Sequence, residues 1–244
     1  MRLRRLSRFA SAAPLVLALI AIGCVAAPEA STDQAQSRPP ASTRAADLDR
    51  APEGTDTVEE FRRDMATAQK FAEEYWRTRL RSDGVAFRPV RQVIAYSREG
   101  EVDCGGQPIG LNNAAYCSVG DFIAYDINWA YGAFKQIGDA FIYYLLGHEY
   151  AHAIQLRLRI RKQFTIQQEL QADCMAGAYL GDSERADKLT VGDSDISEFR
   201  RGLEAVGDDP NQPWFAEGSH GTARQRTQAF VNGYEDSLEP CGLP

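Results

Sequence analysis

The sequence contains little histidine, with only His148, His152 and His220 among 244 residues. It has five cysteines, none in the C-x-x-C spacing that is typical of zinc fingers and ribbons, and it shows no internal repeat. Its formal net charge is −7 and it has no large basic patch, which argues against nucleic acid as a partner. These absences disfavour a cysteine-built metal site, a repeat array and a nucleic-acid-binding protein.

Two of the three histidines stand four residues apart, in the segment His148-Glu149-Tyr150-Ala151-His152. On a helix, this H-E-x-x-H pattern places two imidazoles one turn apart on one face, where both can bind one zinc ion. Apolar residues at helical spacing predict a half-buried helix from about Gly138 to Leu158. Glu149 is about 100° around this helix from His148, so it borders the site without being a ligand.

A second segment, Glu169-Leu170-Gln171-Ala172-Asp173, offers two carboxylates four residues apart on a helix predicted from about Ile166 to Leu180. The intervening stretch is long enough for the first helix to end and for the second to return antiparallel. We therefore predict one zinc ion (Zn²⁺) per chain, bound by His148, His152 and Glu169.

Asp173 is expected to accept a hydrogen bond from the outer N–H of His148 and so to fix the tautomer of that ring. The alternative is a polar helix face whose histidines are ordinary buried side chains, with Glu169 and Asp173 as solvated acids. The spacing of the two carboxylates from each other and from the histidines favours the metal site.

The N-terminus has the pattern of a signal peptide, with four arginines ahead of an apolar run from Phe9 to Ile22. Small residues then lead into Cys24, as in a bacterial lipobox, and we expect residues 1–23 to be removed and Cys24 to be lipidated. Cleavage by ordinary signal peptidase near Ala26 and an uncleaved anchor are the alternatives. Each places the remainder outside the cytoplasm, so we expect an extracytoplasmic envelope protein, anchored to the outer face of the membrane or secreted.

Residues 24–56 are rich in Ala, Pro, Ser and Thr with almost no large apolar side chain, which predicts a flexible tether. A chain of this length with 44% hydrophobic residues can bury one core, and we expect it over residues 57–244. The expected class is α+β, predominantly helical, with a small antiparallel β-sheet or hairpin. Besides the two metal-site helices, the predicted elements are a helix opening at a Thr57 capping box, strands at Pro89–Ser97 and Asp121–Asp126, a helix ending at Gly207, and a last helix at Ala223–Tyr234.

With Cys24 assigned to lipid, four cysteines remain, and an even number in an exported chain suggests two disulfides. Three pairings are possible. A bond between Cys104 and Cys117, which would close a short loop, is the first choice, and it leaves Cys174 to pair with Cys241. The second bond would bring the C-terminal segment close to the predicted metal site.

Together these segments resemble a bacterial family, the "putative neutral zinc metallopeptidases". The similarity runs from about Val93 to Cys241. It includes both metal-site segments and also Cys104-Gly105, Tyr116-Cys117, Gly138-Asp139, Gly192-Asp193, Gly207-Asp208-Asp209 and His220-Gly221. The resemblance implies a zincin-like single domain with zinc on His148, His152 and Glu169 and with Glu149 as catalytic base. The family usually has Gly at the position of Ala151 and often His at that of Ala153; neither is a ligand position.

We therefore expect a zinc-dependent peptidase acting on a peptide or protein substrate. In this hypothesis the metal activates water, and Glu149 takes the water's proton and delivers it to the leaving amine. His220, in a Gly-Ser-His-Gly loop, is the candidate donor to the anionic intermediate; alternatively it is a surface loop residue or a neighbour of a helix N-cap. An extended substrate is expected to pair with the strand around Phe122–Asp126 as an edge strand.

Two other functions remain open. One is an envelope binding or chaperone-like protein with a structural or vestigial zinc site, and the other is an amidase of cell-wall peptides. Glu149 favours an enzyme, because a structural site needs no base beside the metal. The one basic run, Arg157–Lys162, is interpreted as a solvated helix end or as a contact for acidic substrates or lipid headgroups.

Overall fold

The structure is a computed structural model that describes residues 35–36 and 57–243. The predicted signal peptide, the lipidation site at Cys24 and the predicted tether lie outside the described residues, except for Ala35–Gln36. Among the described helices, none combines the length and the apolar character that crossing a membrane requires.

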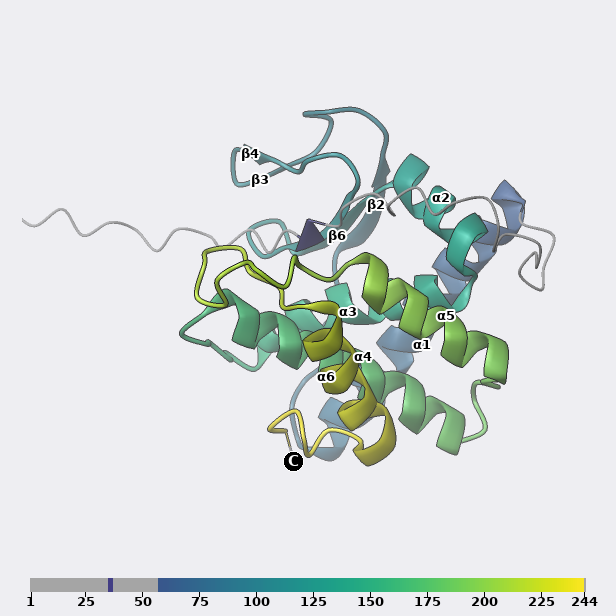
Figure 1. The fold of residues 1–244 in the computed structure, drawn as a ribbon. Helices are drawn as coiled ribbons and strands as arrows, with labels where there is room; N and C mark the ends of the chain where they lie inside the picture. Colours follow the sequence, from purple (N-terminus) through teal and green to yellow (C-terminus); the bar gives the residue numbers. More distant parts are fainter. Residues whose placement is uncertain (1–34, 37–56, 244) are drawn as a thin grey trace, which may run out of the picture.

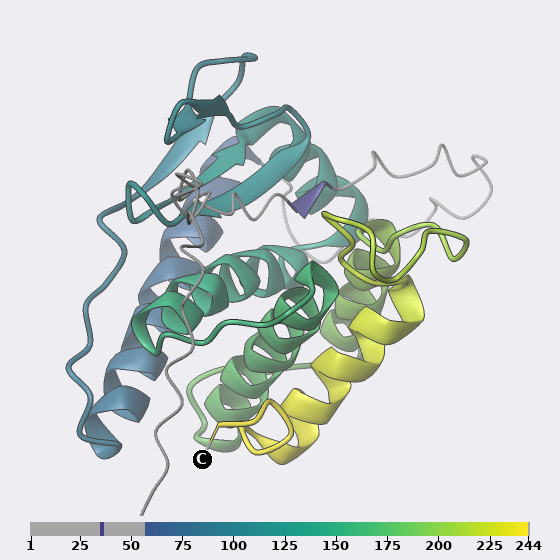
Figure 2. The ribbon, with the colours of Figure 1, turned by 90° about the vertical axis from the view of Figure 1, so that its left-hand side faces the viewer.

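The described chain forms a helical layer with a sheet on one side of it, which confirms the predominantly helical α+β class (Figures 1 and 2). The helices are α1 (Val58–Ser82), α2 (Ile127–Ile137), α3 (Ala140–Arg157), α4 (Thr165–Arg185), α5 (Asp193–Ala205) and α6 (Ala223–Asp236). The strands are β1 (Ala35–Gln36), β2 (Gln92–Tyr96), β3 (Asp103–Cys104), β4 (Gln107–Pro108), β5 (Asn113–Cys117) and β6 (Phe122–Asp126).

The first helix begins where the sequence predicts, because the Thr57 hydroxyl accepts a hydrogen bond from the backbone N–H of Glu60 at 3.1 Å. Strands β2 and β6 and helices α3 to α6 also lie at predicted positions. Helix α2 and strand β5 were not predicted, and β5 lies in a stretch interpreted as loop. All five residues of β5 are buried, so the strand lacks the alternation that marks a half-exposed strand.

The main sheet has the strand order β1-β5-β6-β2. Strands β5 and β6 form an antiparallel hairpin, but the two predicted strands, β2 and β6, pair in parallel, with Gln92 opposite Phe122. The sheet is therefore mixed, and the expectation of an antiparallel sheet is wrong in this respect. Strand β6 is therefore an inner strand, and the prediction that its edge binds substrate is wrong. Strand β5 is an inner strand too, because the two-residue strand β1 pairs antiparallel with its other side.

Helix α3 is the central element of the helical layer and contacts α1, α2, α4, α5 and β5. From Ala140 to Gln155 every residue except Tyr143 is buried, so the prediction of a half-buried helix is wrong. The polar residues of α3 are buried because other elements supply their hydrogen-bond partners, which a sequence pattern alone does not reveal.

Helices α4 and α6 pack with almost no side chains between them. A Cβ atom added to Gly177 would lie 2.0 Å from the carbonyl oxygen of Phe230, and one added to Gly233 would lie 1.9 Å from that of Cys174. These glycines therefore allow the two backbones to approach directly, which fixes α6 relative to the helix that carries Glu169.

The cysteines pair as the sequence analysis favoured. The sulfur atoms of Cys104 and Cys117 are 1.99 Å apart, and those of Cys174 and Cys241 are 2.08 Å apart. The second pair attaches the C-terminal segment to α4. Disulfides persist in oxidising compartments, which agrees with the predicted export, although export itself stays a prediction.

Replacement of Gly177 by Ala is expected to lower the free energy of unfolding by about 1–3 kcal/mol, because the α6 backbone must move away. Gly132 in α2 is the matched control, since no atom lies within 4 Å of its added Cβ. Gly132→Ala is expected to leave stability unchanged or to raise it by up to about 1 kcal/mol. Urea denaturation measures both, and equal stability of the two variants would contradict this packing.

Candidate metal centre

The predicted ligands come from two antiparallel helices. His148 and His152 lie on α3, and Glu169 lies on α4. The antiparallel direction follows from the contacts, because His148 meets Asp173 whereas Gln155, farther along α3, meets Gln168, earlier on α4. The i, i+4 spacing on each helix and the antiparallel pairing together bring the three side chains to one point.

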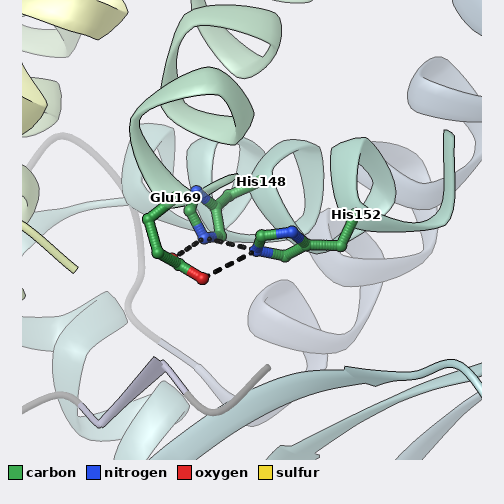
Figure 3. Close-up of side chains that lie close together, drawn as sticks. All are labelled: His148, His152 and Glu169. Carbon is green, nitrogen blue, oxygen red and sulfur yellow. Dashed lines mark hydrogen bonds and ion pairs between the residues drawn. The ribbon is translucent and has the colours of Figure 1, made fainter. Parts of the chain in front are cut away.

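The three side chains converge through their polar tips (Figure 3). The Nε2 atoms of His148 and His152 are 3.1 Å apart, and the Glu169 carboxylate lies 3.1 Å from the first and 3.5 Å from the second. All three residues are buried, and their candidate ligand atoms lie within 4.8 Å of one another. The alternative in which Glu169 and Asp173 are solvated acids is therefore wrong.

Each imidazole is oriented from behind by a hydrogen bond at Nδ1. The His148 Nδ1 lies 2.8 Å from Asp173 Oδ1, as predicted, and the His152 Nδ1 lies 2.8 Å from Gln155 Oε1. The Gln155 amide nitrogen donates to the Gln168 carbonyl, so its oxygen is the atom that faces His152. Both acceptors require a proton on Nδ1, which leaves both Nε2 lone pairs directed towards the convergence point.

Asp173 lies in a buried ion pair with Arg226 of α6. The guanidinium contacts both carboxylate oxygens, at 2.8 and 2.9 Å, and the Tyr144 hydroxyl donates to the same carboxylate at 2.8 Å. Burial raises the pKa of Asp173, but Arg226 and His148 outweigh that effect and lower the pKa to about 2. Asp173 is therefore ionised at neutral pH and provides a permanent negative charge behind His148.

The charges around His148 favour a cation at this point. Burial lowers the pKa of His148, but the carboxylates of Asp173 and Glu169 outweigh burial and raise the pKa to about 9. Two imidazole nitrogens and one carboxylate form a donor set typical of catalytic zinc. The residues present thus fit a zinc ion in both charge and ligand type.

Glu149 is fully buried beside this group. Its Oε2 accepts a hydrogen bond from the backbone N–H of Tyr116 in β5 at 2.7 Å, and burial raises the pKa of the carboxyl. Its Oε1 has no hydrogen-bond partner among the described residues. Leaving a buried acceptor unpaired costs free energy, so this oxygen points to a group that donates to it in the working protein.

His220 is buried in the loop between α5 and α6, so the surface-loop alternative is wrong. It is outside the group of converging ligand atoms. The Asp208 carboxylate accepts from the backbone N–H groups of His220 and Gly221, at 2.6 and 2.8 Å, and lies 3.5 Å from the His220 Nδ1. Burial lowers the pKa of His220, but the carboxylates of Asp208 and Glu169 raise it by more, so the net shift of the pKa is upward.

The sequence analysis missed Arg226, Gln155, Tyr116 and Asp208. The sequence does indicate that Arg226 is buried, because Arg226 stands four residues before Phe230 and so lies on the same face of the last helix. A charge at a core position requires a partner of opposite charge. Tyr116 and Asp208 lie in segments that carry the family resemblance, but the role of Tyr116 could not be predicted, because it acts through its backbone N–H.

Arg226→Met is expected to lower the free energy of unfolding by about 3–5 kcal/mol, because Asp173 then remains buried and charged without its partner. Arg224→Met is the matched control, since Arg224 lies on the same helix but is exposed, and little change is expected. Adding Asp173→Asn to Arg226→Met should recover part of the loss. Equal urea midpoints for the Arg226 and Arg224 variants would show that the ion pair is not structural.

The chain is similar to a protein family and to curated proteins of Escherichia coli. The chain is 27% identical over 196 residues to the "Uncharacterized protein YpfJ" of Escherichia coli strain K12, and equally to that of Escherichia coli O6:H1. The alignment covers 69% of this chain and 66% of each relative, just under two thirds of their length. No solved structure matches the chain. The family model described as "Putative neutral zinc metallopeptidase" matches residues 5–241, and the chain therefore belongs to that family.

Proposed function

We propose that this protein is a zinc-dependent peptidase. One observation carries the proposal: two Nε2 atoms and the Glu169 carboxylate converge within 4.8 Å, beside the buried Glu149. When bound, zinc would lower the pKa of a water molecule towards about 7 and polarise the scissile carbonyl. The chain's own residues must then move a proton, stabilise negative charge and hold the substrate.

Glu149 is the proposed proton carrier. The Tyr116 N–H holds its Oε2, so the carboxylate cannot rotate away, and Oε1 is left to accept a proton from water and to release it to the leaving amine. Burial raises the pKa of Glu149, which brings its proton affinity closer to that of the groups with which it exchanges.

His220 is the proposed donor to the developing oxyanion. Its raised pKa favours the protonated ring, and Asp208 anchors both its backbone and its Nδ1 side. A fixed donor of positive charge stabilises an anionic intermediate more than it stabilises the neutral amide. His220 would act without contributing to metal binding, since it is outside the ligand group.

The proposed substrate is an extended peptide that takes the place of β1 beside β5. Alternate residues of a strand direct their backbone groups to the same edge, so Ala114 faces the edge from which Tyr116 donates to Glu149. Strand β1 pairs antiparallel with this edge, with Ala35 opposite Ala114. This side of β5 therefore pairs with an extended backbone at Ala114, two residues from Tyr116, which holds the proposed base Glu149.

A set of three substitutions separates metal binding from chemistry. Glu149→Gln is expected to retain zinc but to lower kcat roughly a hundred- to ten-thousand-fold, because no base remains. His148→Ala is expected to lose both zinc and activity, whereas His220→Ala should retain zinc and lower kcat more than it changes KM. Elemental analysis and cleavage of unfolded casein measure the two properties.

Unchanged turnover in Glu149→Gln would remove the catalytic assignment. Loss of zinc in His220→Ala would make His220 a ligand and place Glu169 in doubt. Stoichiometric zinc in a wild-type protein that cleaves neither casein nor cell-wall peptides would favour a binding protein with a structural metal.

Substrate pairing with β5 can be tested with a cleavable peptide that is N-methylated at one backbone amide at a time. Methylation of an amide that faces β5 should lower kcat/KM, and moving the methyl group by one residue should restore it, because alternate amides face the partner strand. We expect kcat/KM to fall for every second amide that is methylated along the peptide. A smooth dependence on distance from the scissile bond would contradict strand pairing.

A further inference from the structure

The loop between α5 and α6 exposes two large aromatic side chains, Trp214 at 54% and Phe215 at 62% of their surface. This loop projects from the body of the protein beside the start of α6 (Figure 2). Most aromatic residues of the described chain are buried or half-buried, so the pair is unusual here. Exposed aromatic residues that gather in one place mark interaction sites more often than scattered ones do.

A second loop completes the patch. The ring of Phe164, in the connection between α3 and α4, lies 4.9 Å from that of Trp214, which in turn lies 5.6 Å from that of Phe215. Two loops about fifty residues apart in sequence thus form one surface, called here the aromatic surface and made of Phe164, Trp214 and Phe215.

Three cations stand next to this surface in the sequence. Arg159, Arg161 and Lys162 precede Phe164 in the same connection, and all three are exposed. None of them has an ion-pair partner among residues 57–243, although the whole chain carries a net charge of −7. The neighbouring loop carries three acids. Asp208 accepts hydrogen bonds from the backbone of His220 and Asp209 accepts them from Asn211, while Glu217 is exposed.

The loop that carries Trp214 is built from successive turns. The N–H of Gln212 donates to the Asp209 carbonyl, and that of Ala216 donates to the Pro213 carbonyl, both at 2.9 Å. Asp208 closes the base of the loop through its hydrogen bonds to the segment that contains His220. The two aromatic residues are therefore held out from the body by a folded loop.

We infer that the aromatic surface and its three cations dock on a lipid bilayer with anionic headgroups. Tryptophan and phenylalanine insert at the boundary between headgroups and acyl chains, and adjacent arginine and lysine bind anionic lipid. Because the chain as a whole is acidic, a local group of cations is needed to attract it to such a membrane. The inference does not require the protein to hydrolyse anything.

Docking would also orient the candidate metal centre. The tip of the loop carries Trp214 and Phe215, and its base carries His220 and Asp208. A bilayer at the tip therefore places the proposed site within one loop length of the membrane surface. The substrates reached first would be peptide segments close to that surface.

Tryptophan fluorescence reports this contact selectively. The chain has three tryptophans, and Trp76 and Trp129 are 1% and 8% exposed, so a change in emission on adding vesicles arises from Trp214. We expect a blue shift when vesicles containing phosphatidylglycerol are added to residues 24–244 with Cys24→Ser, a protein without the predicted signal peptide and without any lipid of its own. Vesicles of phosphatidylcholine alone, and high salt, should give little shift.

The charge-reversal variant Arg161→Glu/Lys162→Glu is expected to raise the lipid concentration for half-maximal shift roughly tenfold or more. The matched control is Arg62→Glu/Arg63→Glu, an equal charge change at exposed positions on α1, which should behave like the parent. The inference is wrong if no vesicle shifts the emission, or if neutral vesicles or the charge-reversed variant do so equally well. A shift on adding unfolded casein without lipid would instead assign the aromatic surface to the substrate.

Discussion

The buried carboxylate of Asp173 is the group on which the rest of this structure depends. It accepts hydrogen bonds from Arg226 on α6 and Tyr144 on α3, and it faces the Nδ1 of His148. Three helices are thus joined through one charge that water does not reach. Because removing any partner leaves a buried group unpaired, the network specifies one relative position for α3, α4 and α6.

Two further contacts help to fix the residues around the metal site. They are the direct contact of α4 with α6 and the hydrogen bond from β5 to Glu149. Glycines bring α6 close enough for Arg226 to reach Asp173, and the Tyr116 N–H fixes the carboxylate that neighbours the two rings. Helix α4 thus holds His148 and Gln155 of α3, and strand β5 holds Glu149. Such preorganisation is what a catalytic metal centre requires of its ligands and base.

The sequence predicted the parts of the site that depend on local geometry. The i, i+4 spacing located His148 and His152, and the same rule paired Glu169 with Asp173, because helix geometry alone sets those relations. Arg226 was missed since its partner lies on another helix, and β5 was missed since burial of both faces removed its alternation. The parallel pairing of β2 with β6 depends on the path of the whole chain, which no local pattern encodes.

Zinc K-edge X-ray absorption of the purified protein tests the central claim most directly. We expect one zinc per chain with two imidazole nitrogens and carboxylate oxygen at about 2.0–2.2 Å, and with no sulfur at about 2.3 Å. The imidazole contribution should disappear, together with the metal, in His148→Ala. A spectrum with sulfur ligands, or zinc that remains fully bound in that variant, would contradict the central claim.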